Sequence, residues 1–284
     1  MRKKIISKIV CPKCRGKLKL IKIKQKEDRI TEGKFICGRC NLAYDIVDGI
    51  VYFRAITKKD KNVQKMKEMQ NLFLKQEFRK EWLKNFTEKE IGALRKEWNW
   101  LINELDIKNS KSHLEWAVGT GRFLRNILNK TSGEIIVLDI DYSTCLGLKI
   151  LLEKLKKYSK ITIILGDAKT MPFIDNAFDS VSCWHGIDEP NIEKALDESK
   201  RVLRNKKTLA VSGVFFEKKS ESLKIAKRFK INFAEENKAY QYFIKKGFKK
   251  INYKIFIKTK EIDKRNFLPC YNDFYTVYGI SGEK

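Results

Sequence analysis

The sequence predicts an α/β fold in which a small N-terminal module and a helical connector precede a doubly wound, mostly parallel sheet. Two observations carry this prediction. From residue 108 onward, short apolar runs typical of strands alternate with amphipathic stretches typical of helices, as in successive βαβ units. Near the N-terminus, two Cys-x-x-Cys pairs flank residues of alternating polarity. The 284 residues suffice for one α/β domain and a small satellite. We expect the segments 1–56, 57–107 and 108–284.

The N-terminal module carries cysteine pairs at metal-ligand spacing. Its ligand candidates are Cys11, Cys14, Cys37 and Cys40. Tetrahedral zinc binds four soft ligands, and each pair supplies two of them from one tight turn. The residues between the pairs predict a hairpin with strands at 18–23 and 30–36. A module this small has few core residues, so we expect structural zinc (Zn2+) to hold it together.

Two other states of the cysteines stay open, namely disulfide pairs and unligated thiols. Disulfides need an oxidising compartment, and the apolar residues behind the basic residues 1–4 are too few for a signal peptide. No apolar run approaches the roughly 18 residues that a membrane-spanning helix needs. We therefore expect a soluble, cytoplasmic protein with reduced thiols and no membrane partner.

Residues 57–107 predict a structured connector. A charged run spans residues 58–61, and proline and glycine are sparse. Apolar residues recur at near-helical spacing, which predicts two or three helices packed against the sheet domain. These residues are Met66, Met69, Leu72, Phe73, Phe78, Trp82, Leu83, Phe86, Leu94, Trp98, Leu101, Ile102 and Leu105.

The third segment alternates between strand-like and helix-like stretches. A strand that ends near Trp116 turns through Gly119 and Gly121 directly into a helix-like pattern. Further strands are predicted at 134–138, 161–165, 177–184 and 208–212, and helices at 146–158 and 192–203. The aromatic-rich C-terminal residues predict the last, antiparallel strands of the sheet.

The glycine turn is the first candidate ligand site. A strand, a glycine turn and a helix start together expose backbone N–H groups that can face a nucleotide-like cofactor. Two other interpretations stay open. The turn closes a tight corner with no ligand, or it binds a nicotinamide cofactor. Leu124 stands where the nicotinamide fingerprint needs a third small residue, which argues against the second.

This segment resembles the class I S-adenosylmethionine-dependent methyltransferases, over roughly residues 110 to 280. Their acidic-x-Gly-x-Gly-x-Gly turn matches Glu115-x-Ala117-x-Gly119-x-Gly121, with alanine in place of the first glycine. The resemblance implies a Rossmann-like sheet and S-adenosyl-L-methionine as cofactor. It also implies that an acid after the second strand binds the ribose, and that an acid after the third strand contacts the adenine. These positions fall on Asp139, with Asp141 as the competing choice, and on Asp167 with Ala168 beside it.

The N-terminal module resembles the small zinc-ribbon activator subunit that partners tRNA, rRNA and protein methyltransferases. The matching patterns, within residues 7 to 53, are Cys-Pro-x-Cys-x-Gly-x-Leu and Cys-x-x-Cys-x-x-x-Tyr-x-Ile-x-Asp-Gly-Ile. The resemblance implies an activator fused to its catalytic chain. Whether a further protein partner is needed stays open.

Catalysis of methyl transfer needs an acceptor held in line with the methyl carbon, and a base only where the acceptor loses a proton. The family resemblance implies that residues after the fourth strand face the methyl group, which points to Trp184, His185 and Asp188. His185 suits a proton acceptor near neutral pH. A purely positional role for His185 stays open.

The charge balance bears on the acceptor. With 61 basic and 35 acidic side chains, the formal net charge is +26, which favours a polyanionic partner. We therefore expect methylation of RNA, either rRNA or tRNA. A small-molecule or lipid-precursor acceptor is the alternative, because the pattern of residues 172–179 also occurs in metabolite enzymes. A catalytically silent RNA-binding or partner-stabilising subunit is the second alternative, because Ala117 departs from the cofactor motif.

Overall fold

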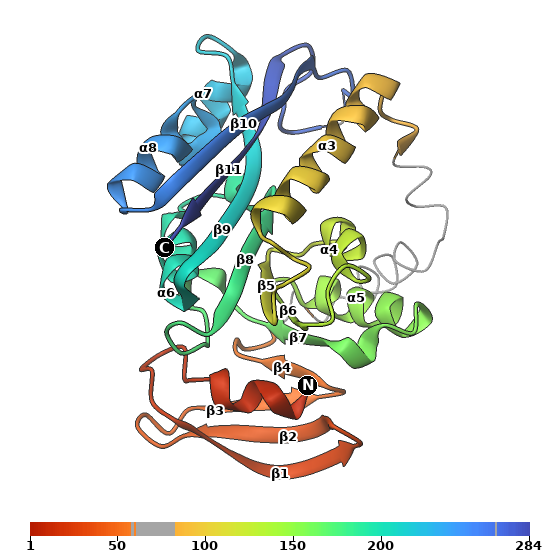
Figure 1. Ribbon diagram of the computed structural model, residues 1–284, viewed down its shortest axis with the longest axis vertical. Helices are drawn as coiled ribbons and strands as arrows, with labels where there is room; N and C mark the ends of the chain where they lie inside the picture. Colours follow the sequence, from red (N-terminus) through yellow and green to blue (C-terminus); the bar gives the residue numbers. More distant parts are fainter. Residues whose placement is uncertain (58–59, 61–82, 265) are drawn as a thin grey trace.

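The computed structural model describes residues 1–57, 60, 83–264 and 266–284, which form one eleven-stranded sheet flanked by helices (Figure 1). The spatial order of the strands is β1-β2-β3-β4-β7-β6-β5-β8-β9-β11-β10. Their bounds are β1 Leu18–Lys26, β2 Arg29–Cys37, β3 Ala43–Val47, β4 Ile50–Tyr52, β5 Ser112–Trp116, β6 Glu134–Asp139, β7 Ile161–Leu165, β8 Phe178–Trp184, β9 Leu203–Phe216, β10 Lys249–Lys260 and β11 Phe274–Glu283.

The sheet has a parallel centre and antiparallel ends. Strands β4, β7, β6, β5, β8 and β9 pair in parallel, whereas β1 to β4 and β9, β11 and β10 pair antiparallel. The predicted fold class is confirmed, although the whole sheet is mixed rather than mostly parallel. The difference arises because β4 joins the N-terminal hairpin to the parallel centre, so both modules share one sheet.

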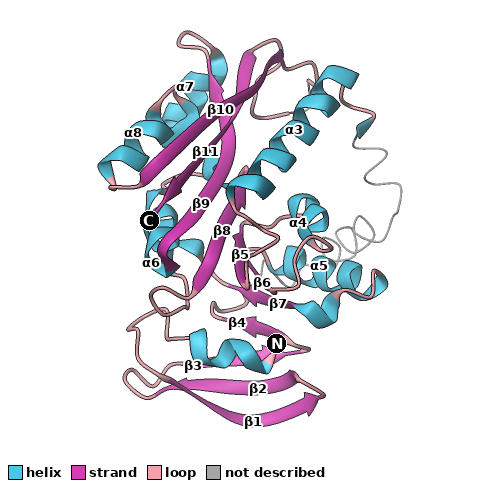
Figure 2. Ribbon diagram, in the orientation of Figure 1, coloured by secondary structure: helices cyan, strands magenta, loops and turns pink. Residues whose placement is uncertain are grey.

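Helices cover both faces of this sheet (Figure 2). Their bounds are α3 Glu88–Glu104, α4 Arg122–Ile127, α5 Tyr142–Lys154, α6 Glu193–Val202, α7 Glu221–Arg228 and α8 Lys238–Lys245. Side chains of β6 alternate between two cores, as a period of two requires. Ile135 and Val137 belong to the core that contains residues of α3, α4 and α5, whereas Ile136 and Leu138 belong to the core that contains residues of α6 and α8. The sheet is therefore doubly wound.

Two helix boundaries show how caps decide element ends. Helix α5 begins at Tyr142, four residues before the predicted start, because Asp141 accepts a hydrogen bond from the Thr144 amide at 2.8 Å. Helix α3, in the predicted connector, begins after Thr87, which forms a capping box with Glu90. The other expected connector helices involve residues 61–82 and, with Lys58, Lys59 and Lys61, lie outside the described residues.

The N-terminal module is joined to the sheet domain through backbone and core. Val51 and Tyr52 of β4 pair in parallel with Ile164 and Leu165 of β7. The core that contains Phe35 and Phe53 of the module also contains Phe173 and Phe178 of the domain. The module is therefore an extension of the domain, although the segment boundaries 1–56, 57–107 and 108–284 stay predictions.

No helix within the described part of the chain is long and apolar enough to cross a lipid bilayer. The expected cytoplasmic location stays a prediction.

Candidate functional site

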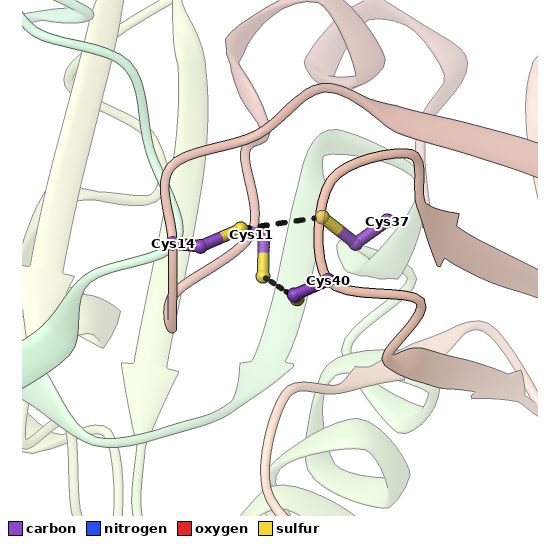
Figure 3. Close-up of side chains that lie close together, drawn as sticks. All are labelled: Cys11, Cys14, Cys37 and Cys40. Atoms are coloured by element: carbon purple, nitrogen blue, oxygen red, sulfur yellow. Dashed lines mark hydrogen bonds between the residues drawn. The ribbon is translucent and has the colours of Figure 1, made fainter.

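The four cysteines of the N-terminal module lie together (Figure 3). Their sulfur atoms are all within 4.8 Å of one another, with 3.6 Å between Cys11 and Cys40 and 3.4 Å between Cys14 and Cys37. A disulfide would need about 2.05 Å, so the sulfurs are not bonded. The first turn needs glycine at position 16, where a Cβ would come within 3.0 Å of the Cys37 sulfur. Four soft donors from two turns fit tetrahedral zinc.

Residues at and just before the first cysteine turn form hydrogen bonds with the loop that follows β7. The Val10 amide donates to the Pro172 carbonyl at 3.0 Å, and the Ile174 amide donates to the Lys8 carbonyl at 2.9 Å. The guanidinium of Arg15 donates to the Phe173 carbonyl at 3.1 Å. The four-cysteine module is therefore connected by hydrogen bonds to the segment that begins with Asp167 and Ala168.

The glycine turn between β5 and α4 has the backbone conformation that its composition predicts. Ala117, Gly119 and Gly121 have φ angles of 52°, 50° and 69°, in the left-handed region that favours glycine. A Cβ on Gly121 would lie 2.8 Å from Leu148, so this glycine lets α5 approach the turn. A Cβ on Gly119 would meet no described atom within 4 Å, so open space lies beside that residue.

Ala117 replaces the first glycine of the motif, and its methyl group does not lie in the open space beside Gly119. The methyl group of Ala117 lies against Gly186, where a Cβ would approach it to 2.5 Å. The departure from the motif therefore adds a methyl group next to the loop after β8. Its cost is the left-handed backbone, which disfavours an alanine by about 1 kcal/mol.

Two buried acids flank the turn. Asp139 Oδ2 accepts from the Gly119 amide and Asp139 Oδ1 from the Asp141 amide, both at 2.9 Å. Burial raises the pKa of Asp139, although these amides oppose the shift. Burial, and next the charge of Asp139, raise the pKa of Glu115 well above its usual range. Glu115 Oε2 has no hydrogen-bond partner among the described residues. Asp141 differs from both, because it caps α5.

The third predicted acid follows the neighbouring strand. Asp167 comes two residues after β7, and its Oδ1 accepts from the Lys169 amide at 2.8 Å. Ala168 begins the short 3-10 helix that follows. Because β5, β6 and β7 are adjacent and parallel, their carboxyl ends bring Glu115, Asp139 and Asp167 to one edge of the sheet.

A second cluster lies at the end of β8. His185 Nε2 is 3.1 Å from Glu97 Oε1, and His185 Nδ1 is 3.3 Å from Asp188 Oδ2. Burial lowers the pKa of His185, but Glu97 and Asp188 outweigh this and raise it to about 10. Burial raises the pKa of Asp188 even though His185 opposes the shift. The imidazole is therefore charged at neutral pH, and both of its nitrogens are occupied.

Glu97 is the residue of this cluster that the sequence prediction missed. It is 2% exposed and lies on α3, where Oε1 also accepts from Trp184 Nε1 at 2.9 Å. A signal for it exists in the sequence. Glu97 stands between Leu94 and Leu101 at helical spacing, on the face predicted to be buried. A carboxylate on a buried face needs partners, and here they are Trp184 and His185.

A cavity of about 470 Å³ opens next to this cluster. It lies between α3 and the strands β10 and β11, and Arg122 of the turn segment reaches it. Its lining is mixed in polarity. The lining residues are Asn85, Phe86, Glu90, Ala93, Leu94, Glu97, Arg122, Trp184, His185, Val214, Ile257, Thr259, Lys260, Glu261, Ile262, Asp263, Asn266, Leu268, Pro269, Tyr275 and Val277.

Two families of known proteins match separate parts of the chain. The Trm112p-like protein family matches residues 2–49, and the methyltransferase domain family matches residues 114–206. The chain carries a class I methyltransferase domain and a Trm112p-like domain. It is an S-adenosylmethionine-dependent methyltransferase, and its four-cysteine cluster fits structural zinc.

The chain is similar to curated proteins and to solved structures. A demethylmenaquinone methyltransferase of Staphylococcus carnosus (strain TM300) is 26% identical over 184 residues, which cover 55% of this chain and 75% of the relative. An uncharacterized methyltransferase of Schizosaccharomyces pombe is 26% identical over 192 residues, covering 65% and 73%. The structure of geranyl diphosphate C-methyltransferase from Streptomyces coelicolor A3(2) aligns with a TM-score of 0.54 at 8% identity, covering 66% of this chain and 75% of that chain. The last similarity shows the fold.

The residues at the glycine turn of the methyltransferase fit its cofactor. S-adenosylmethionine carries a sulfonium, an ammonium and donor hydroxyls, which are groups that buried carboxylates stabilise. Glu115 offers an unpartnered oxygen among the described residues, Asp139 lies next to it, and Gly119 borders open space. The individual roles of Glu115, Ala117, Gly119, Gly121, Asp139, Asp167 and Ala168 stay predictions.

Proposed function

We propose that this methyltransferase transfers a methyl group to a small-molecule acceptor bound in the cavity between α3 and the C-terminal strands. The cavity itself is the observation that carries the proposal. It begins at Trp184 and His185 and is reached by Arg122, next to the glycine turn. Its volume of about 470 Å³ lies in the range of small-molecule sites. RNA is the first acceptor that the sequence predicts, and a small-molecule acceptor is the alternative.

We assign the cofactor to the carboxyl ends of β5, β6 and β7. In this assignment Asp139 accepts from the ribose hydroxyls, Glu115 balances positive charge, and Asp167 accepts from the adenine edge. Asp139 is preferred to Asp141 because its carboxylate bonds the Gly119 amide inside the turn, whereas Asp141 caps α5. The sulfonium supplies an activated methyl group for direct displacement.

In the proposed mechanism His185 positions groups rather than accepting a proton. Its nitrogens face Glu97 and Asp188, and its raised pKa leaves no free basic site at neutral pH. Glu97 orients Trp184 and His185 together, since one oxygen accepts from both. Trp184 and His185 then form a fixed wall of the cavity against which an acceptor is held.

The comparisons support the small-molecule interpretation of the acceptor. The curated relatives include demethylmenaquinone methyltransferases, and the solved structure is named for geranyl diphosphate; both names refer to small molecules. The apolar part of the lining, which includes Leu94, Ile257 and Val277, suits an acceptor with an apolar body. RNA remains the second candidate, favoured by the net charge of +26.

The proposal is tested by transfer of labelled methyl from S-adenosylmethionine into a cell extract that is then separated into small-molecule, RNA and protein fractions. We expect label in the small-molecule fraction, and none with Asp139→Ala. Label confined to RNA would contradict the proposal and restore the RNA interpretation. Salt distinguishes the same two cases, because transfer to RNA should fall steeply as salt rises.

A further inference from the structure

The segment between β10 and β11 exposes an unusual set of side chains. Ile262 is 67% exposed and Phe267 is 63% exposed, and Tyr271 of the same segment and Phe274, the first residue of β11, are also exposed. Phe229, at the end of α7, joins them, with its ring 5.5 Å from that of Phe267. We call Phe229, Ile262, Phe267, Tyr271 and Phe274 the apolar rim. Phe229 and Phe267 are in ring contact and the other three lie in or next to the same segment; exposed apolar side chains that gather in one region mark interaction sites.

Basic side chains border the apolar rim, although Lys258 pairs with Glu217 at 2.6 Å and Lys227 pairs with Glu235 at 3.2 Å. Lys258 and Lys260 lie over the ring of Phe274 at 5.6 and 5.9 Å, and Lys264 lies over that of Tyr271 at 5.1 Å. Lys227, Arg228 and Lys230 flank Phe229 in the chain and are exposed.

The acids of the same segment turn inward. Glu261 is buried and accepts from the Asp263 amide and from Asn266, whereas Asp273 accepts from Ser222 at 2.7 Å. Asp263 is half-buried and lines the cavity. The described side chains that the segment exposes are therefore apolar, neutral or basic.

The apolar rim adjoins the cavity. Ile262 lines the cavity itself, as do Leu268 and Pro269, whose neighbour Phe267 points to solvent. In Figure 1 the segment between β10 and β11 lies at the upper end of the molecule, opposite to β1, β2 and β3. The apolar rim and the opening of the cavity therefore lie at the same end of the molecule.

We propose that the apolar rim and its lysines dock this methyltransferase on an anionic lipid surface, from which an apolar acceptor enters the cavity. Apolar and aromatic side chains that insert at the headgroup level, together with flanking lysines, are the combination that binds anionic membranes. The four aromatic rings of the rim also suit stacking on RNA bases, so an RNA surface is the rival that the test separates; Ile262, the most exposed of the five, has no ring and favours the lipid surface. The link to an acceptor rests on the proposed function, whereas docking itself does not.

The test is sedimentation of the full chain with vesicles of phosphatidylcholine, with and without phosphatidylglycerol. We expect binding to the anionic vesicles only. The double variant Phe267→Ser/Tyr271→Ser, at positions that do not line the cavity, should bind at least about tenfold more weakly. The matched control is Ile23→Ser, at a residue of β1 that is 51% exposed at the other end of the molecule. It should bind as the unmodified protein does.

Two results would overturn the proposal. One is vesicle binding that is absent, or that is equal in the double variant and the unmodified protein. The other is tighter binding to a single-stranded RNA oligonucleotide than to vesicles, weakened by the same double variant. Equal affinities for S-adenosylmethionine in all three proteins establish that folding is intact. Vesicle binding needs no methyl transfer. The protein can therefore bind vesicles even if it methylates no small molecule, and it can methylate a small molecule even if it binds no vesicles.

Discussion

The four-cysteine cluster and the cavity beside β8 are built in different ways. The cysteines come from two tight turns joined by one hairpin, so their meeting follows from local spacing. The cavity is assembled from α3, the turn after β5, the end of β8 and the last two strands, which are far apart in the sequence. A metal can hold the first cluster, whereas the second depends on hydrogen bonds such as those of Glu97. The two should therefore respond differently to substitution.

Removal of zinc should have the largest effect. Metal binding contributes on the order of 10 kcal/mol to the folding of small zinc modules. Because β4 continues the sheet into β7, loss of the module should also lower the unfolding temperature of the methyltransferase domain. We expect this from chelation and from Cys37→Ser, measured by calorimetry together with the zinc content.

Cys270→Ser is the control, since Cys270 lies outside the cluster. Equal unfolding temperatures with and without zinc would show that the module folds without metal.

Asp139→Ala should have the next largest effect, on cofactor binding. A carboxylate that accepts from ribose hydroxyls contributes about 2–3 kcal/mol, so the affinity for S-adenosylmethionine should fall about 100-fold. Titration calorimetry measures it. Asp141→Asn keeps an oxygen to cap α5 and should bind almost normally. If Asp141→Asn loses affinity and Asp139→Ala does not, the ribose assignment is reversed.

Glu97→Gln tests the cluster beside the cavity. The amide removes the charge that faces His185 and Trp184, so we expect the rate of transfer to fall about tenfold or more, because the wall of the cavity loosens. The affinity for S-adenosylmethionine should stay within about twofold, since Glu97 lies outside the glycine turn. Glu88→Gln makes the same change at an exposed site of α3 and should alter neither quantity. Equal losses of rate and cofactor affinity in Glu97→Gln would point to general unfolding.

The same cluster predicts a pH dependence of stability. The pKa of His185 rises on folding to about 10, so its contribution is complete below about pH 6.5 and is lost as the pH rises toward 10. The free energy of unfolding should therefore decline over this range. The decline should be smaller in His185→Gln, as denaturant titrations at several pH values would show. An identical decline in both proteins would contradict the charged state of His185.

Ala117→Gly should have the smallest effect. Unlike the other substitutions, it should raise a measured quantity, namely the free energy of unfolding. Glycine relieves the left-handed backbone, and loss of one methyl group and greater unfolded-state entropy offset part of the gain. We expect stabilisation of up to about 1 kcal/mol by thermal unfolding. Ala168→Gly, at a residue without a positive φ, should destabilise instead. A loss of stability in Ala117→Gly would mean that packing against Gly186 dominates.

The sequence predicted the parts of this molecule that depend on local patterns. The four cysteines, the hairpin, the glycine turn and the strands that end at Asp139 and near Asp167 each have a signature of spacing or polarity. The sequence could not predict that β4 would pair with β7, because strand partners are chosen by long-range packing. Glu97 was missed for the same reason, since its partners lie on an element far along the chain. The position of His185 was predicted, but its charge depends on Glu97 and Asp188.

The most direct test of the account fills the cavity. Ala93 of α3 lines it, so Ala93→Phe should block an acceptor while leaving the glycine turn intact. Gly92→Phe, on the same helix at a position where a Cβ meets no described atom within 4 Å, is the matched control. With the acceptor found in the extract, we predict that Ala93→Phe loses transfer at least about 100-fold with unchanged affinity for S-adenosylmethionine, and that Gly92→Phe keeps both. Full transfer by Ala93→Phe would contradict the claim that the cavity holds the acceptor.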